Sequence, residues 1–329
     1  MASAQTSLLE FQKSFPDDAS CARFLLRQRW PSGFVCPQCG GRRGTALSTR
    51  SRTYECLACG RQTSLTAGTI MHRSKLPLTA WFWAAYLLAS RANGLAAREL
   101  QIQLGVSYRT AWLMMQKFRR AMADADPQKL SGAVEIGRSQ LPFRSRGGRS
   151  IAIVAAVELL DAAREGAAEA GASSMRAGRL RLASLRNGSQ AEIEAFIRAN
   201  VASGSALTGD PGKELDGFRR LRHGGAASQY VPAVFARLKR WSLGTHGGLR
   251  RKHVDHYLAE FAFRANRRLL GPLRFELILG LAARHRPVGY WDIVGRGNPR
   301  LRKAAPRPGA PAPRPAARRS TRSRRIDPA

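Results

Sequence analysis

The stretch Gly132–Leu141, GAVEIGRSQL, is where the fold of this chain can first be read. Val134 and Ile136 alternate with Glu135 and Gly137, and a period of two is typical of a strand with one buried face. The stretch follows a region with helical patterning. It therefore predicts the first strand of a sheet.

The elements that follow come in an informative order. Strand-like patterns cover 151–160 and 179–185, and a turn-rich connection of small residues lies between them. A helical pattern at 189–201 and a short strand at 205–208 come next. Three strands, a helix and a strand match an RNase H-like fold, although periodicity alone allows other α/β arrangements.

The charge of the chain indicates its class of partner. Its 329 residues include 55 Lys and Arg but only 22 Asp and Glu, so the formal net charge is +33. Self-repulsion on this scale favours a polyanionic partner, and we expect nucleic acid. A basic structural protein such as a ribosomal component remains open, because counterion release stabilises complexes of any basic surface.

The N-terminus and the apolar runs predict where the chain resides. MASAQTSLLEFQKSFPDD lacks the basic start and apolar core of a signal peptide. The longest apolar run, 78–90, is shorter than the roughly 20 residues of a membrane span and predicts a buried helix. We expect a cytoplasmic, nucleoid-associated bacterial protein without a membrane partner, in which five cysteines serve metal ligation rather than disulfides.

Two CxxC pairs predict a structural Zn²⁺ site. Sixteen residues separate the pairs, and each is followed by a glycine, Gly40 or Gly60, that permits a tight turn. The predicted ligands are Cys36, Cys39, Cys56 and Cys59. Four thiolates leave no open coordination position, so the zinc is structural, and a redox site would need only one pair. Cys21 stands apart and is interpreted as a buried apolar residue.

Residues 94–122 predict a helix-turn-helix. Ala97, Leu100 and Leu104 mark one face of the first helix, and a Gly-Val-Ser turn follows. Ser107 can cap a second helix that runs from Tyr108 to about Met122, and such a helix can enter the major groove of DNA. The predicted contacts are Arg109, Thr110, Lys117, Arg119 and Arg120. An ordinary antiparallel helix pair with a solvated basic face stays open.

Three segments carry a resemblance to a known family. They are FPDDASCARFLLRQRWPSGFVCPQCG at 15–40, YECLACGRQTSLTAGTI at 54–70 and LKRWSLGTHGGLRRKHVDHYLAEFAFRANRR at 238–268. Over about residues 10–270 the chain resembles the transposases of the 1595-type insertion-sequence family. The resemblance implies a zinc ribbon, a DNA-binding helical unit and an RNase H-like integrase domain. It also implies DNA recombination by cleavage of insertion-sequence ends and strand transfer, on double-stranded DNA.

The implied reaction needs three acidic positions for two Mg²⁺ ions. The resemblance places the first acid at Gly137, which is followed by Arg138, and the second at Asp210, where the preceding threonine of the family motif is Gly209. It places the third position seven residues before Lys239, and this residue is Pro232. Two of the three positions therefore carry no oxygen ligand.

Other candidate residues follow from the same comparison. Glu135 is a weak catalytic candidate, because it precedes Gly137 by two residues, or about 6.6 Å along a strand, and Asp216 is weaker still. Lys239 and Arg240 are the implied DNA contacts on the third segment. Glu260 is interpreted as the partner of a nearby arginine. The histidines of this segment, His246, His253 and His256, are interpreted as structural.

The sequence thus predicts a multidomain protein that combines α+β and α/β folds. The expected parts are a zinc ribbon at 10–68, a helix-turn-helix unit at 69–128, an RNase H-like domain at 129–298 and a disordered basic tail at 299–329. The expected function is that of a transposase-like DNA-binding protein with a degraded acid triad, which leaves its activity as an enzyme open. The alternative is a non-enzymatic DNA-binding regulator of transposase descent. A homodimer on DNA is compatible with either function.

Overall fold

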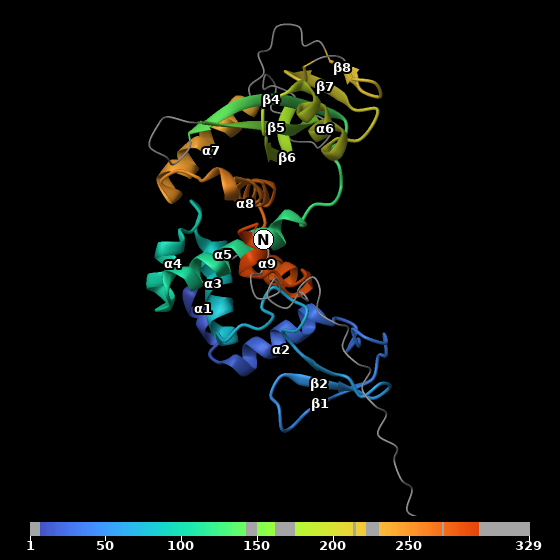
Figure 1. Ribbon diagram of the computed structural model, residues 1–329, viewed down its shortest axis with the longest axis vertical. Helices are drawn as coiled ribbons and strands as arrows, with labels where there is room; N and C mark the ends of the chain where they lie inside the picture. The colour runs from blue at the N-terminus through green and yellow to red at the C-terminus, as the bar shows by residue number, and fades with distance from the viewer. Residues whose placement is uncertain are drawn as a thin grey trace, which may run out of the picture.

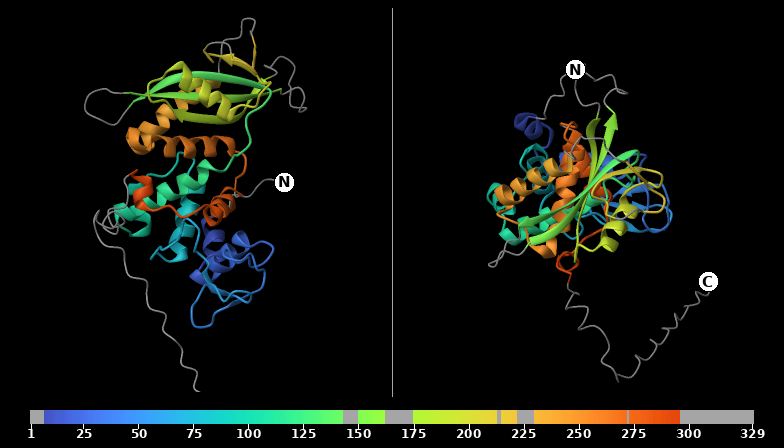
Figure 2. Two further views of the ribbon diagram at one scale, coloured as in Figure 1. Left: turned by 45° about the vertical axis from the view of Figure 1, so that its right-hand side comes forward. Right: turned by 90° about the horizontal axis from the view of Figure 1, so that it is seen from above.

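A computed structural model describes residues 7–142, 150–161, 175–212, 215–221, 230–271 and 273–295. Three parts follow one another along the long axis: a small ribbon, a group of helices and a larger sheet covered by helices (Figures 1 and 2). The predicted tail at 299–329 lies outside the described residues. In the part of the chain that is described, no helix is both long and apolar enough to cross a membrane.

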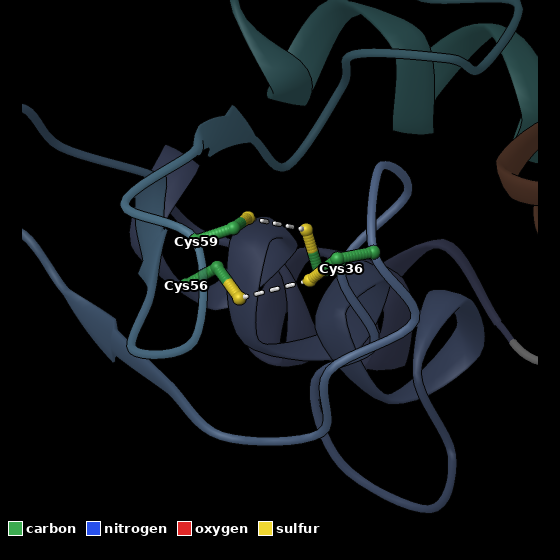
Figure 3. A group of neighbouring side chains, drawn as sticks. Cys36, Cys56 and Cys59 are labelled. Atoms are coloured by element: carbon green, nitrogen blue, oxygen red, sulfur yellow. Dashed lines mark hydrogen bonds between the residues drawn. The ribbon is translucent and has the colours of Figure 1, made fainter.

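The N-terminal part consists of two helices and a three-stranded antiparallel sheet. The helices are α1 (Leu8–Ser14) and α2 (Asp18–Arg29), and the strands are β1 (Gly44–Ala46), β2 (Thr53–Cys56) and β3 (Gln62–Ser64), in the order β1-β2-β3. The two cysteine pairs lie on loops that face each other (Figure 3). Cys21 is fully buried in α2, as predicted, and burial raises the pKa of its thiol to about 12.

Four helices form the middle part around one apolar core. They are α3 (Leu78–Ser90), α4 (Ala97–Leu104), α5 (Tyr108–Ala123) and α9 (Leu273–Arg284). The apolar run at 78–90 is the buried helix that the sequence predicts. Phe275 and Leu279 of α9 lie in the same core as α2, α3 and α5. The helical unit is therefore completed by a segment that the sequence assigns to the domain at 129–298.

The larger sheet has five strands in the order β6-β5-β4-β7-β8. They are β4 (Ala133–Pro142), β5 (Ser150–Asp161), β6 (Met175–Ser184), β7 (Ala206–Gly209) and β8 (Arg219–Arg220). β4, β5 and β6 pair antiparallel, whereas β7 runs parallel to both β4 and β8. The four predicted strands are confirmed, and β8 is an addition.

Helices cover both faces of this sheet. Val134 and Ile136 of β4 belong to the apolar core that contains Ile193 of α6 (Gln190–Asn200). The opposite face packs against α7 (Tyr230–His246) and α8 (Val254–Asn266), which are linked by the 3-10 helix η2 (Arg251–His253). The short helix α10 (Tyr290–Ile293) lies against α5 instead. Successive residues of β4 therefore point alternately toward α6 and α7.

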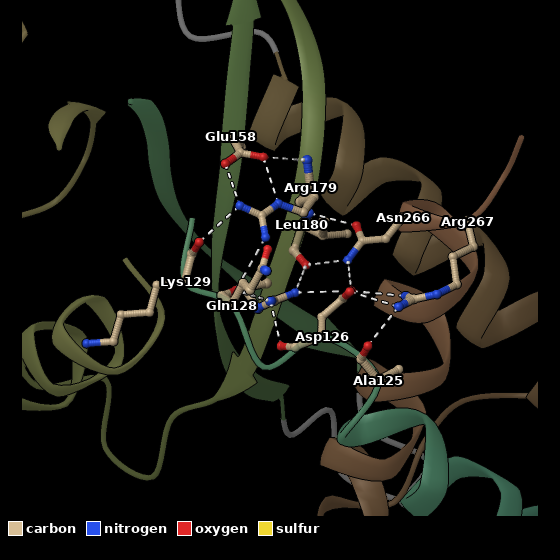
Figure 4. A network of polar contacts seen from close by, with 10 residues as sticks. Ala125, Asp126, Gln128, Lys129, Glu158, Arg179, Leu180, Asn266 and Arg267 are labelled. Atoms are coloured by element: carbon tan, nitrogen blue, oxygen red, sulfur yellow. Dashed lines mark hydrogen bonds and ion pairs between the residues drawn. The ribbon is translucent and has the colours of Figure 1, made fainter. Parts of the chain in front are cut away.

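A polar network fixes the connection between α5 and β4 (Figure 4). The carboxylate of Asp126 accepts hydrogen bonds from Arg267 (2.8 Å) and Asn266 (3.0 Å). Burial alone raises the pKa of Asp126, but the bonds from Arg267 and Asn266 outweigh this effect and hold the pKa below its usual value. Nearby, Glu158 accepts bonds from the Arg179 side chain and the Ser131 amide. The connection is therefore tied to both β6 and the end of α8.

A second polar cluster joins α5 to α8. Nε of Arg119 donates to Glu260 at 2.7 Å, and Nε of Arg264 donates to the other carboxylate oxygen of Glu260 at 3.0 Å. Arg119 and Glu260 are both buried. The expectation that Glu260 pairs with a nearby arginine is confirmed, and the pairing connects the helical unit with the covering helix of the sheet.

Candidate zinc centre and DNA-binding site

The four predicted cysteine ligands converge. Their sulfur atoms lie within 4.8 Å of one another, and two pairs, Cys36 with Cys59 and Cys39 with Cys56, are 3.7 and 3.6 Å apart. A tetrahedral zinc ion with Zn–S bonds of about 2.3 Å requires sulfur separations of about 3.8 Å. The donor set and its spacing therefore fit Zn²⁺ (Figure 3).

Each cysteine pair sits on a turn that its sequence builds. The amide of Gly40 donates to the Cys36 carbonyl and that of Gly60 to the Cys56 carbonyl, and both glycines have positive φ, 72° and 68°. A side chain at either position would be strained. The amides of Cys39 and Gln38 lower the pKa of Cys36 to about 6, which favours the thiolate that zinc binds.

The three positions that the resemblance assigns to acids lie near the C-terminal end of β7, beside the middle of β4. The amide of Asp210 donates to the carbonyl of Ile136 at 2.8 Å, which places Asp210 beside Gly137. A Cβ atom added to Gly137 would lie 2.6 Å from Cγ1 of Val231, the neighbour of Pro232 in α7. The tertiary structure thus brings together residues that are far apart in the sequence.

These positions do not offer a set of oxygen ligands. Gly137 has no side chain, and Pro232 is an exposed residue in the first turn of α7 without a side-chain oxygen. The Asp210 carboxylate accepts two hydrogen bonds from Arg138, at 2.9 Å from Nε and 2.5 Å from Nη2. Among the described residues, the four cysteines form the one group of three or more side chains suited to a metal. The site does not fit a pair of Mg²⁺ ions.

Glu135 has a structural task. Its side chain is buried, and its two carboxylate oxygens accept hydrogen bonds from the backbone amides of Tyr230 (3.2 Å) and Val231 (2.9 Å). These amides begin α7, so the carboxylate stabilises the positive end of the helix. The candidate role of Glu135 as a catalytic acid is therefore corrected: its oxygens are directed at the helix terminus.

Gly209 ends β7 in a conformation that only glycine adopts easily. Its φ is +80°, and a Cβ atom there would collide with the carbonyl oxygen of Ile136. The threonine that the family motif has at this position would not fit this backbone. The turn at Gly209 directs the chain so that Asp210 meets Arg138.

The predicted helix pair at 94–122 is present. α4 and α5 are joined by a turn in which Gly105 has φ +63°, and the Ser107 hydroxyl accepts a hydrogen bond from the Thr110 amide at 3.2 Å. Ala111, Met115 and Phe118 are buried as predicted. The N-cap and both helices of the prediction are thus confirmed.

Two predicted DNA contacts on α5 are wrong. Lys117 is buried, and its ammonium donates to the Ile70 carbonyl at 2.7 Å. Arg119 is 1% exposed and is held by Glu260. Both cations meet acceptors from distant segments, which the helical spacing of α5 does not reveal. Neither side chain is available to DNA.

The remaining face of α5 is covered beyond its first turn. Oε1 of Gln116 is hydrogen-bonded to Nδ1 of His256 (2.9 Å), and the Trp112 ring lies 5.2 Å from that of His253. The first turn keeps an exposed Tyr108 and an Arg109 whose guanidinium lies 4.7 Å from the Tyr290 ring centre. Two more of the predicted contacts are half-buried, namely Thr110 and Arg120. The accessible part of α5 is therefore short.

The predicted contacts on α7 remain accessible. Arg240 is exposed and Lys239 is half-buried. Lys239 follows Pro232 by two helical turns, so the two residues share a face of α7.

The three histidines near α8 have structural roles. His246 packs against the rings of Trp241 and Tyr257, at 4.6 and 4.8 Å, and burial lowers its pKa to about 3. Burial likewise lowers the pKa of His256 to about 4. Both are neutral near pH 7, in agreement with the interpretation made from the sequence.

Comparison with known proteins gives two domain matches. Residues 16–62 match the transposase zinc-ribbon domain, which includes the four cysteines, and residues 129–266 match the ISXO2-like transposase domain, which includes positions 137, 210 and 232. No solved structure matches the chain.

A curated relative also comes from a transposable element. The chain is 32% identical over 148 residues to an uncharacterized protein in transposable element ISH50 of Halobacterium salinarum. The matched region covers 41% of this chain and 49% of the relative, so the chain spans about half of that protein's length. Both domain matches and this relative confirm the resemblance to 1595-type insertion-sequence transposases that was read from the sequence.

Proposed function

We propose that this chain binds double-stranded DNA at insertion-sequence ends and has lost the capacity to cleave and join them. One observation carries the proposal: the three positions expected to hold metal converge, yet their one carboxylate, on Asp210, is bound by Arg138. Two-metal phosphoryl transfer needs oxygen ligands that hold both ions at the scissile phosphate. Glycine and proline at the other two positions cannot provide them.

The sheet supports an RNase H-like domain at about 129–266. Three antiparallel strands are followed by a helix and two parallel strands, and the first strand lies at the centre beside the fourth. α6 covers one face and α7 the other. The first four strands and α6 follow one another along the chain in the order expected from the sequence. We assign α9 to the helical unit rather than to this domain.

The DNA-binding part of the proposal rests on charge and on accessible cations. The net charge of +33 favours a polyanion. In the helical unit, Arg109 in the first turn of α5 is exposed, where residues of a recognition helix contact base edges. On the sheet domain, α7 carries the half-buried Lys239 and the exposed Arg240.

The test is a combined binding and cleavage assay on duplexes that carry the ends of the cognate element. We expect a retarded complex in gel shift and no nicked or joined product with Mg²⁺ or Mn²⁺. The matched control is a duplex of shuffled sequence. Metal-dependent product that disappears in Asp210→Asn would refute the loss of activity, and equal affinity for both duplexes would refute end binding.

The same geometry favours a regulatory use of the complex. A protein that occupies the ends without cutting them obstructs an active relative, because both compete for one DNA site. We expect strand transfer by an active family member to fall as this chain is added, in proportion to the fraction of ends it occupies. Undiminished transfer at saturating occupancy would exclude this use.

A further inference from the structure

Arg138 binds Asp210, the one carboxylate among the three positions where the resemblance places metal ligands. It follows Gly137 in β4, and its side chain is 43% exposed while that of Asp210 is 55% exposed. Both hydrogen bonds to Asp210 come from the edge formed by Nε and Nη2 and end on one oxygen, Oδ2. Within the described structure, the second edge, formed by Nη1 and the other hydrogen of Nη2, carries no hydrogen bond to a protein acceptor.

The backbone around Asp210 positions this ion pair. The Asp210 amide is bound to the Ile136 carbonyl, and the left-handed turn at Gly209 lies directly before it. Asp210 has a short side chain, so its carboxylate has little freedom once its backbone is held. The arginine is therefore presented with one edge occupied and the other toward solvent.

A guanidinium edge of this kind matches a phosphate. Two parallel N–H donors meet two phosphate oxygens, and the geometry is more selective than that of an ammonium ion. A nearby cation favours an extended polyanion over a single free phosphate. Nη1 of Arg220, exposed on β8, lies 3.4 Å from the carbonyl of Gly212, two residues after Asp210. Arg138 and Arg220 thus flank the end of β7.

We propose that the surface beside the C-terminal end of β7, next to Arg138 in the middle of β4, is a metal-independent site for a backbone phosphate of DNA, and that Arg138 is the residue that binds this phosphate. The inference rests on the proposed function, because DNA reaches this site only if the chain binds insertion-sequence ends. The guanidinium fixed here can hold the phosphate through the hydrogen bonds of its second edge, without divalent ions. It provides no activated water and no stabilised leaving oxygen.

The test uses the full chain with zinc bound and an end-containing duplex in fluorescence anisotropy, in EDTA and again in Mg²⁺. The central variant is Arg138→Gln with Asp210→Asn, which removes one charge of each sign and keeps the net charge at +33. The matched control is Arg91→Gln with Glu99→Gln, another exposed pair, at 3.0 Å. Thermal unfolding and zinc content verify that both double variants are folded.

We expect the central variant to bind about eightfold more weakly at 0.1 M salt, because one phosphate contact changes the slope of log K against log salt by about 0.9. The slope should fall by that amount in the central variant, whereas the control pair should bind with the affinity and slope of the wild type. Replacing EDTA by Mg²⁺ should change neither the affinities nor the slopes. A second measurement replaces single phosphates of the duplex by neutral methylphosphonates. One position should weaken the wild type and leave the central variant unaffected.

Two failures are distinguishable. If the wild type binds end and shuffled duplexes equally, the proposed function fails. The phosphate site is wrong if the wild type prefers the ends but the central variant binds as tightly as the control pair. It is also wrong if no methylphosphonate position weakens the wild type while leaving the central variant unaffected. Should the central variant unfold, Arg138→Lys serves instead: it keeps the charge, so the salt slope should stay while the coupling to the methylphosphonate weakens.

Discussion

Replacing Glu260 by glutamine tests whether the helical unit and the sheet domain are held together by a buried ion pair. Glu260 of α8 accepts hydrogen bonds from Arg119 of α5 and from Arg264 of its own helix. Glutamine keeps the size of the side chain but removes its charge. Arg119, 1% exposed, is then a buried cation without a counterion.

The expected cost can be estimated in two ways. Breaking a buried ion pair by removing one partner costs about 3–5 kcal/mol. The second estimate uses the pKa of Glu260: burial raises it, but Arg119 and Arg264 outweigh burial and lower it from 4.5 to about 2. At 1.36 kcal/mol per pKa unit, this difference corresponds to about 3 kcal/mol of stability. The two estimates agree.

The assay is urea unfolding of the zinc-bound chain at pH 7, followed by tryptophan fluorescence. Glu260→Gln should lower the free energy of unfolding by about 3–5 kcal/mol without a change in the urea dependence. The matched control is Glu99→Gln, whose partner Arg91 is 47% exposed while Glu99 itself is 36% exposed. This surface pair should contribute at most about 1 kcal/mol.

The pH dependence provides a further check with a definite sign. Because folding lowers the pKa of Glu260, its contribution is complete above pH 4.5 and is lost as the pH falls toward 2. The difference between wild type and Glu260→Gln should therefore shrink across that window. Equal stability of Glu260→Gln and Glu99→Gln at pH 7 would refute the reasoning, since the buried pair would then count no more than the exposed one.

Three other perturbations have defined outcomes. Chelation of zinc, or Cys59→Ser, should release about one zinc per chain and make residues 30–65 sensitive to protease. Metal release and limited proteolysis measure these effects, and a ribbon that resists protease without zinc would contradict the prediction. Glu135→Gln should destabilise the chain by about 1–3 kcal/mol in thermal unfolding, because the α7 terminus loses a charged acceptor; no shift would reject the capping role. Gly137→Asp should lower the free energy of unfolding by about 1–3 kcal/mol, because the new Cβ atom would contact Val231. Adding Val231→Ala should recover part of this loss, and no recovery would reject the contact as the cause.

Much of the architecture could be predicted from local patterns. The alternation in β4 and the apolar run of α3 correspond to the elements observed, since period and apolar content determine which face a segment buries. The four-cysteine cluster was equally predictable, because two CxxC pairs at this spacing have few alternatives. These features depend on neighbours within a few residues or on one strong chemical preference.

The DNA-contacting face of α5 was predicted less well. Lys117 and Arg119 occupy positions that an isolated helix would expose, and their burial depends on Ile70 and Glu260. Glu260 is 141 residues from Arg119 along the chain. No spacing within α5 carries that information, so a charged residue with a remote partner is read as a surface residue.

The loss of oxygen ligands at positions 137 and 232 is decided by the sequence alone, because glycine and proline lack the required atoms in any fold. Only the tertiary structure decides which partners the remaining carboxylates, those of Glu135 and Asp210, bind. It directs Glu135 to the amides of α7 and joins Asp210 to Arg138. The reason is physical: composition determines which groups can donate or accept, whereas long-range packing determines which partner each of them meets.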